Sequence, residues 1–95
     1  MIRGNIYIAG PINGVKDYKK AFDRAKVQFE KDGWDVVSPA EIKGETTRLI
    51  MATELDWIAR CADAMYMLRG WEKSFGAIAE HAVAVAIGLQ IIYQT

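Results

Sequence analysis

The chain has 95 residues, 52% of them hydrophobic, and its 12 basic and 12 acidic side chains give zero formal net charge. A chain of this length has enough apolar material for one core, so we expect a single domain spanning residues 1–95. No basic stripe stands out, which argues against a nucleic-acid polymer as the partner. No apolar run reaches the roughly 20 residues of a membrane-spanning helix, so no membrane partner is expected.

Cysteine usage and the N-terminal pattern favour a reducing cytoplasm. Cys61 is the only cysteine and cannot form an internal disulfide. The segment from Met1 to Gly14 is typical of a short strand followed by a polar turn, not of a signal peptide. One histidine and one cysteine without ligand spacing predict no metal site. The Gly10–Gly14 segment lacks the dinucleotide fingerprint and the phosphate-loop lysine, and we expect no cofactor.

Apolar spacing predicts strands that alternate with helices along the chain. Such alternation favours a parallel sheet in an α/β fold. Right-handed crossovers then favour the strand order 2-1-3-4. On the helix after the second strand, we expect Met51, Leu55, Ile58 and Ala62 to form the inner stripe. The predicted strands are 5–9, 34–37, 64–68 and 90–93, and the predicted helices are 17–32, 46–61 and 74–87.

The segment from Trp71 to Glu80 joins the third strand to the third helix, and ligands bind at such a place in open parallel sheets. Ser74 is a suitable N-cap residue. Gly76 costs a helix about 1 kcal/mol relative to alanine, which suggests a close approach to the backbone. The free N–H groups and the helix dipole favour an anion there, and Glu80 lies about one turn further along. A capped helix with a packing glycine and a solvated glutamate is the alternative interpretation.

Carboxylates are the candidate catalytic groups. Glycosidic bonds are cleaved with an acid and a nucleophile or base. Glu80 is the candidate nucleophile, and either Glu54 or Asp56 on the preceding helix could act as the acid or orient the sugar. For whichever of these two faces away, ordinary solvated helix charge is the expected role.

The third helix, from Ser74 to Ile87, predicts a homo-oligomer. After His81 it is apolar nearly all round, and such a helix is covered on more than one side. In so small a domain we expect a second subunit to supply that cover, in a dimer or larger assembly. Trp57 and Trp71 suit either that interface or the core, and His81 is expected to be a packing or interface residue.

Several segments together carry a resemblance to a known family. Residues 7–14, Tyr-Ile-Ala-Gly-Pro-Ile-Asn-Gly, resemble the opening motif of the nucleoside 2-deoxyribosyltransferase-like superfamily. The chain is most similar to a small branch found often in phage and bacterial genomes, the domain-of-unknown-function 4406 family. The supporting segments, in the same order as in the family, are 38–41, 54–58, 61–64 and 70–77, followed by Glu80.

The resemblance implies a flavodoxin-like, Rossmann-like three-layer sandwich and a small nucleoside or nucleotide ligand. Characterised relatives use a helix glutamate to attack C1′ of a deoxyribose, and Glu80 matches it. Ser74 matches a serine that holds the 5′-phosphate in the branch that hydrolyses nucleotides. Glu54 occupies approximately the place of the relatives' acid, with Asp56 close by. The residues that the resemblance and the spacing assign to substrate binding are Tyr7, Gly10, Pro11, Asn13, Ser74 and Gly76.

Three functions fit these residues. The first is an enzyme that cleaves the N-glycosidic bond of a (deoxy)nucleoside 5′-monophosphate through a glutamate nucleophile, by hydrolysis or deoxyribosyl transfer. The second is a nucleotide-binding sensor or sequestering protein without turnover. The third is an interaction module that keeps only the fold, which the apolar third helix would suit.

Overall fold

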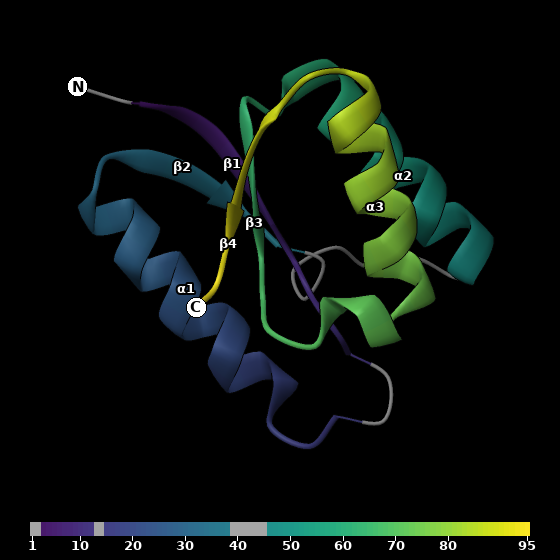
Figure 1. The fold of residues 1–95 in the computed structure, drawn as a ribbon, viewed down its shortest axis with the longest axis horizontal. Helices are drawn as coiled ribbons and strands as arrows, with labels where there is room; N and C mark the ends of the chain where they lie inside the picture. The colour runs from purple at the N-terminus through teal and green to yellow at the C-terminus, as the bar shows by residue number, and fades with distance from the viewer. Residues whose placement is uncertain (1–2, 13–14, 39–45) are drawn as a thin grey trace.

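A computed structural model describes residues 3–12, 15–38 and 46–95. Four parallel strands form one sheet in the order β2-β1-β3-β4, which confirms the predicted α/β topology (Figure 1). Each predicted element is present with its bounds within two residues. The strands are β1 (Gly4–Ala9), β2 (Trp34–Val37), β3 (Ala64–Met67) and β4 (Gln90–Tyr93), and the helices are α1 (Tyr18–Lys31), α2 (Thr47–Cys61) and α3 (Phe75–Ala86).

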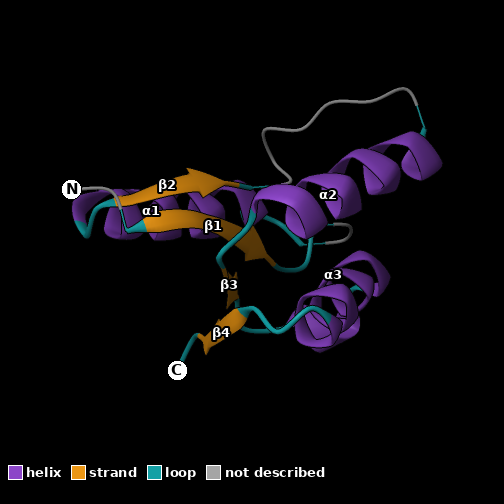
Figure 2. Cartoon of the chain, turned by 90° about the horizontal axis from the view of Figure 1, so that it is seen from above, coloured by secondary structure: helices purple, strands orange, loops and turns teal. Residues whose placement is uncertain are grey.

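The sheet separates two apolar clusters, so the molecule has three layers. Helix α1 covers one face, and α2 and α3 cover the other (Figures 1 and 2). Successive residues of β1 serve opposite faces because side chains alternate along a strand. Ile6 and Ile8 pack with Phe22 and Phe29 of α1. Tyr7 packs in the other cluster with residues of α2 and α3.

The expected inner stripe of α2 is present in part. Ile58 is buried, and the half-buried Leu55 and Ala62 pack against the same apolar cluster, as expected. Ala62 is the extended C-cap residue instead of part of the helix. Met51 lines a cavity beside the N-terminal half of α2, and Glu54 is the second buried residue of the helix.

The connection from β3 to α3 follows the predicted pattern of strand, loop and capped helix. A 3-10 turn, η2 (Trp71–Lys73), precedes Ser74, whose hydroxyl accepts a hydrogen bond from the Ala77 N–H at 3.2 Å. Ser74 is therefore the N-cap of α3, as predicted. This cap fixes where the helix begins.

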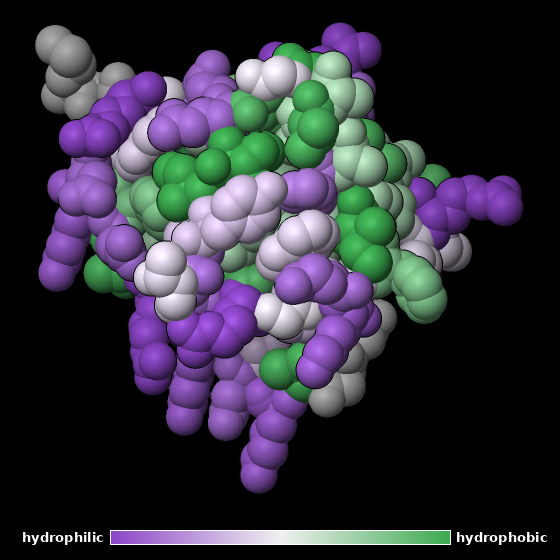
Figure 3. All heavy atoms as spheres, in the orientation of Figure 1, coloured by the Kyte–Doolittle hydropathy of each residue, from purple (hydrophilic) through white to green (hydrophobic). Residues whose placement is uncertain are grey.

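The surface differs between the two helical layers. In Figure 3, hydrophilic side chains project along α1, whereas apolar ones gather over α3. Ile78, Val85 and Ile87 are among the exposed apolar residues of this region. Within the described ranges, no helix has the length and apolar character needed to cross a membrane.

The end of β1 requires a glycine. The chain turns from β1 to β2 on one side and returns to β3 on the other, so the switch point lies between β1 and β3. A Cβ added at Gly10 would lie 2.8 Å from Leu68 Cβ and 2.9 Å from Leu68 Cδ1. Only glycine lets the two strand ends come this close.

We predict that Gly10→Ala lowers the free energy of unfolding by about 1–3 kcal/mol, because the added methyl overpacks the β1/β3 end. Gly76→Ala is a matched control, since a Cβ there would meet nothing closer than Met51 Sδ at 3.6 Å. Alanine is the better helix former, so this control should keep or raise stability by up to about 1 kcal/mol. Urea unfolding of the two variants measures both effects, and equal stabilities would contradict the prediction.

Candidate active site

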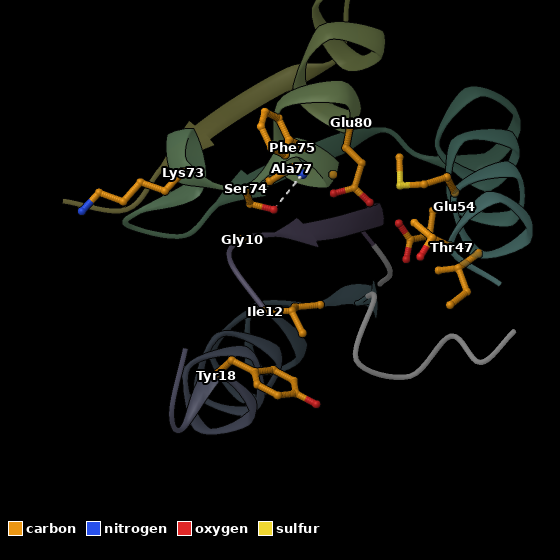
Figure 4. Close-up of a pocket in the computed structure, with 13 residues that line it drawn as sticks. Gly10, Ile12, Tyr18, Thr47, Glu54, Lys73, Ser74, Phe75, Ala77 and Glu80 are labelled. Atoms are coloured by element: carbon orange, nitrogen blue, oxygen red, sulfur yellow. Dashed lines mark hydrogen bonds between the residues drawn. The ribbon is translucent and has the colours of Figure 1, made fainter. Parts of the chain in front are cut away.

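A cavity of about 630 Å³ opens at the β1/β3 switch point. It lies between the N-terminal turn of α3, one face of α2 and the segment that follows β1 (Figure 4). Residues of the segments that follow β1 and β3 both line the cavity. The lining residues are Gly10, Ile12, Tyr18, Thr47, Ile50, Met51, Glu54, Lys73, Ser74, Phe75, Gly76, Ala77 and Glu80.

Two carboxyl groups meet in the deepest part of the site. Glu80 of α3 and Glu54 of α2 are only 2% and 4% exposed, and their carboxyl groups point toward one another (Figure 4). The fully buried Tyr7 of β1 lies beneath them and donates its hydroxyl to Glu80 Oε2 at 2.6 Å. Three elements far apart in sequence thus supply one compact acidic group.

Burial controls the protonation of this group. The pKa of Glu80 is raised to about 9, mainly because the side chain is buried and in addition because of hydrogen bonding and charge repulsion with Glu54. The Tyr7 hydroxyl acts in the opposite direction, because a donated hydrogen bond favours the charged carboxylate. Burial and the two carboxylates also raise the pKa of Tyr7, so it remains a donor. The site therefore holds a proton at neutral pH beside a second carboxyl group, which suits acid–nucleophile chemistry.

The N-terminal turn of α3 forms the opposite end of the cavity. Ser74 and Gly76, both expected from the sequence to bind substrate, line it. The space that a Cβ of Gly76 would fill lies 3.9 Å from Ser74 Oγ, so the first turn is open to a ligand beside that hydroxyl. A helix N-terminus with an accessible backbone and a hydroxyl is suited to an anion such as phosphate.

Of the other site residues expected from the sequence, Gly10 lines the cavity, whereas Asp56, Tyr7 and Pro11 do not. Asp56 is exposed and accepts a hydrogen bond from Arg60 Nε at 2.6 Å, so the structure brings Glu54 and not Asp56 to Glu80. Tyr7 supports Glu80 from below instead of lining the cavity. Pro11 also lies outside the lining, near Gly70. Asn13 lies outside the described residues.

Sequence reasoning missed much of the cavity wall. Tyr18 of α1 and three residues of α2 line it, although only Glu54 and Asp56 were singled out on α2. A signal for these α2 residues does exist, because they share the helix face of Glu54. No comparable pattern marks Tyr18, because its spacing of four residues from Phe22 is that of an ordinary apolar helix face. The three missed α2 residues are Thr47, Ile50 and Met51.

His81 belongs to a separate aromatic group and not to the cavity. Its Nε2 lies 2.8 Å from the Tyr93 hydroxyl, and its ring centroid lies 4.4 Å from that of Trp71. The half-buried Trp71 also packs against the cluster between the sheet and α2 and α3. His81 therefore packs against aromatic rings, in agreement with its expected role.

The fold and site define a class: a parallel α/β protein with a buried carboxyl pair at its topological switch point. The chain belongs to the family described as a domain of unknown function, DUF4406, which matches residues 4–93. Among solved structures it is similar to the 2-desoxiribosyltransferase from Leishmania mexicana, with a TM-score of 0.76 and 21% sequence identity. That match covers 95% of this chain but 63% of the other, so this chain spans less than two thirds of its length. A comparison with curated proteins gave no match.

We predict that the free energy of unfolding of the native protein falls with rising pH relative to Glu80→Gln. Folded Glu80 keeps its proton to about pH 9, whereas the unfolded side chain releases it near 4.5. Between these values the folded state binds more protons, so native stability declines by up to about 1.4 kcal/mol per pH unit. Glutamine does not titrate and lacks this slope. Urea unfolding at about pH 5 and about pH 8 measures the effect: the free energy of unfolding of Glu80→Gln relative to that of the native protein should be larger at the higher pH. An equal difference at both pH values would exclude a raised Glu80 pKa.

Proposed function

We propose that this protein cleaves the N-glycosidic bond of a (deoxy)nucleoside 5′-monophosphate with Glu80 as the nucleophile. The observation that carries the proposal is the buried Glu80–Glu54 pair beside an open helix N-terminus. A nucleoside monophosphate matches this arrangement, because it offers a C1′–N bond and a phosphate on one sugar. Likeness to the transferase fold supports the nucleoside part of the proposal but does not by itself assign an activity.

In the first step, Glu80 passes its proton to Glu54, and the freed carboxylate oxygen of Glu80 attacks C1′ and forms a glycosyl ester. The C1′–N bond breaks, its electron pair passes to the base nitrogen, and Glu54 gives that base a proton. In the second step, water or a second base attacks C1′ and frees Glu80. Water gives hydrolysis and a second base gives transfer. Glu54, now deprotonated, accepts the proton of the attacking group.

Tyr7 assists this transfer of a proton from Glu80 to Glu54. Its hydroxyl donates to Glu80 Oε2, which favours the charged form of Glu80 against the effect of burial. The bond also fixes one carboxylate oxygen, so the other is oriented for attack. We therefore assign Tyr7 a positioning role, because its hydroxyl is covered by Glu80 and lies outside the cavity lining.

A second copy of the chain is part of the proposal. Phe75, Ile78 and Val85 are exposed at 92%, 41% and 55%, and their spacing places them along one side of α3. This apolar stripe supports the homo-oligomer predicted through the helix Ser74–Ile87. Because Phe75 also lines the cavity, such an assembly would place the second subunit close to the bound ligand.

We predict that the native protein releases free base from at least one 5′-monophosphate in a panel of ribo- and deoxyribonucleosides and their monophosphates. Glu80→Ala should lose at least about a thousandfold in rate, because no covalent intermediate can form. Glu54→Gln should lose roughly a hundredfold to ten-thousandfold, because the leaving base is no longer protonated. Chromatography of the free base measures the rates of the native protein and of both variants.

Asp56→Asn is the matched control, since Asp56 lies two residues from Glu54 and its carboxylate faces solvent. Its rate should stay within about twofold of the native rate. Full turnover in Glu80→Ala would refute the mechanism. Nucleotide binding by the native protein without any base release would instead support a sensor or sequestering protein.

We predict that Gly76→Ala weakens binding of a 5′-monophosphate by about tenfold to a hundredfold and leaves the matching nucleoside nearly unchanged. The methyl group would fill the space beside Ser74 Oγ and block charge-assisted hydrogen bonds from the helix turn to phosphate. Isothermal titration calorimetry with both ligands gives the comparison, and the unfolding data for the same variant exclude a folding defect. Equal losses of affinity for the nucleoside and the monophosphate would show that phosphate does not bind at this end of the cavity.

A further inference from the structure

One face of α2 forms a continuous wall of the cavity. Thr47, Ile50, Met51 and Glu54 all line it, and their spacing of three, one and three residues places them on the same side of the helix. In Figure 4, Thr47 and Glu54 lie across the cavity from Ser74 and Glu80 of α3. The cavity therefore has two walls of different chemistry, one on each helix.

The α2 wall changes character along its length. Glu54 at its inner end is buried, Ile50 and Met51 in the middle are half-buried, and Thr47 at its outer end is exposed. Apolar side chains facing a cavity match the flat face of an aromatic ring, and the methionine thioether makes favourable contacts with aromatic systems. A threonine hydroxyl can both donate and accept a hydrogen bond. Together these groups offer an aromatic ring a contact surface and a polar partner at its edge.

The proposed reaction fixes which part of the substrate meets this wall. Ser74 and Glu80 both belong to α3, so the sugar phosphate must lie along that helix for C1′ to reach Glu80. Glu54 protonates the leaving base, so the base must lie on the α2 side. Thr47 is seven residues from Glu54, or about 10 Å along the helix axis. A flat heterocycle with a hydrogen bond at each end can bridge that separation.

We propose that Thr47, Ile50 and Met51 form the base-recognition wall of this site. Ile50 and Met51 contact the face of the base, and the Thr47 hydroxyl pairs with the edge opposite the sugar. Thr47 thus determines which base is preferred, without touching the reacting atoms. This inference rests on the proposed function for the direction of the substrate, but base recognition itself requires no turnover.

The test measures binding in the Glu80→Gln background, so that the ligand is not consumed. The probes are deoxynucleoside 5′-monophosphates with different bases and 2-deoxyribose 5-phosphate, which has none. Thr47→Val should lower the affinity for the monophosphate with the preferred base by up to about tenfold, the loss expected for one hydrogen bond. The affinity for the baseless sugar phosphate should stay within about twofold. Thr47→Ser, which keeps the hydroxyl, should restore the preference. Ile50→Ala, which shortens the other apolar side chain of the wall, should weaken the binding of every base and leave the binding of the sugar phosphate unchanged.

Two results would overturn the base-recognition wall: an equal loss for the baseless sugar phosphate, or an unchanged order of base preference in Thr47→Val. Absence of nucleotide binding by the parent Glu80→Gln protein and by the native protein would overturn it too. The proposed function fails separately, when the native protein binds nucleotides and releases no base. If the base preference of such a protein still changes in Thr47→Val, the base-recognition wall holds for a nucleotide-binding protein without turnover.

Discussion

The hydrogen bond from Tyr7 to Glu80 Oε2 is the contact on which the site depends. It joins the inner strand β1 to α3 across 73 residues of sequence and lies in a buried position. Burying two carboxyl groups next to each other is unfavourable unless one stays protonated and the remaining oxygens find donors. Tyr7 supplies such a donor, so one side chain both satisfies the buried acid and aligns it with the cavity.

The rest of the fold places this contact at the topological switch point of the sheet. Because β1 lies between β2 and β3, its neighbouring connections diverge at its carboxyl end, which leaves space for a ligand there. Gly10 lets the ends of β1 and β3 approach closely, and Ser74 fixes the first turn of α3 beside them. The order of the strands, one glycine and one helix cap therefore determine where the acid pair opens to solvent.

Local patterns made the fold and half of the site predictable from sequence. Alternating periodicities gave the strands and helices, and the spacing of Ser74, Gly76 and Glu80 depends on one helix alone. The choice between Glu54 and Asp56 depends on the rotation of α2, because two residues along a helix point about 200° apart. That rotation is set by packing, with Ile58 buried against the sheet and Asp56 turned to Arg60. Similarly, no local pattern connects Tyr7 with Glu80 or places Met51 opposite Gly76.

The acid pair also bears on the hypothesis that the protein is an interaction module that needs only a stable fold. In the interior of a small domain, replacing buried ionisable groups with apolar residues of similar size is often neutral or stabilising. Glu54 and Glu80 have such surroundings, with Ile58 and Ala77 among the buried residues of the same helices. A module selected only for its fold would gain from apolar residues at both positions, whereas bond cleavage needs both carboxyl groups. The acid pair is therefore easier to explain by chemistry at the cavity than by the stability of the sheet that supports it.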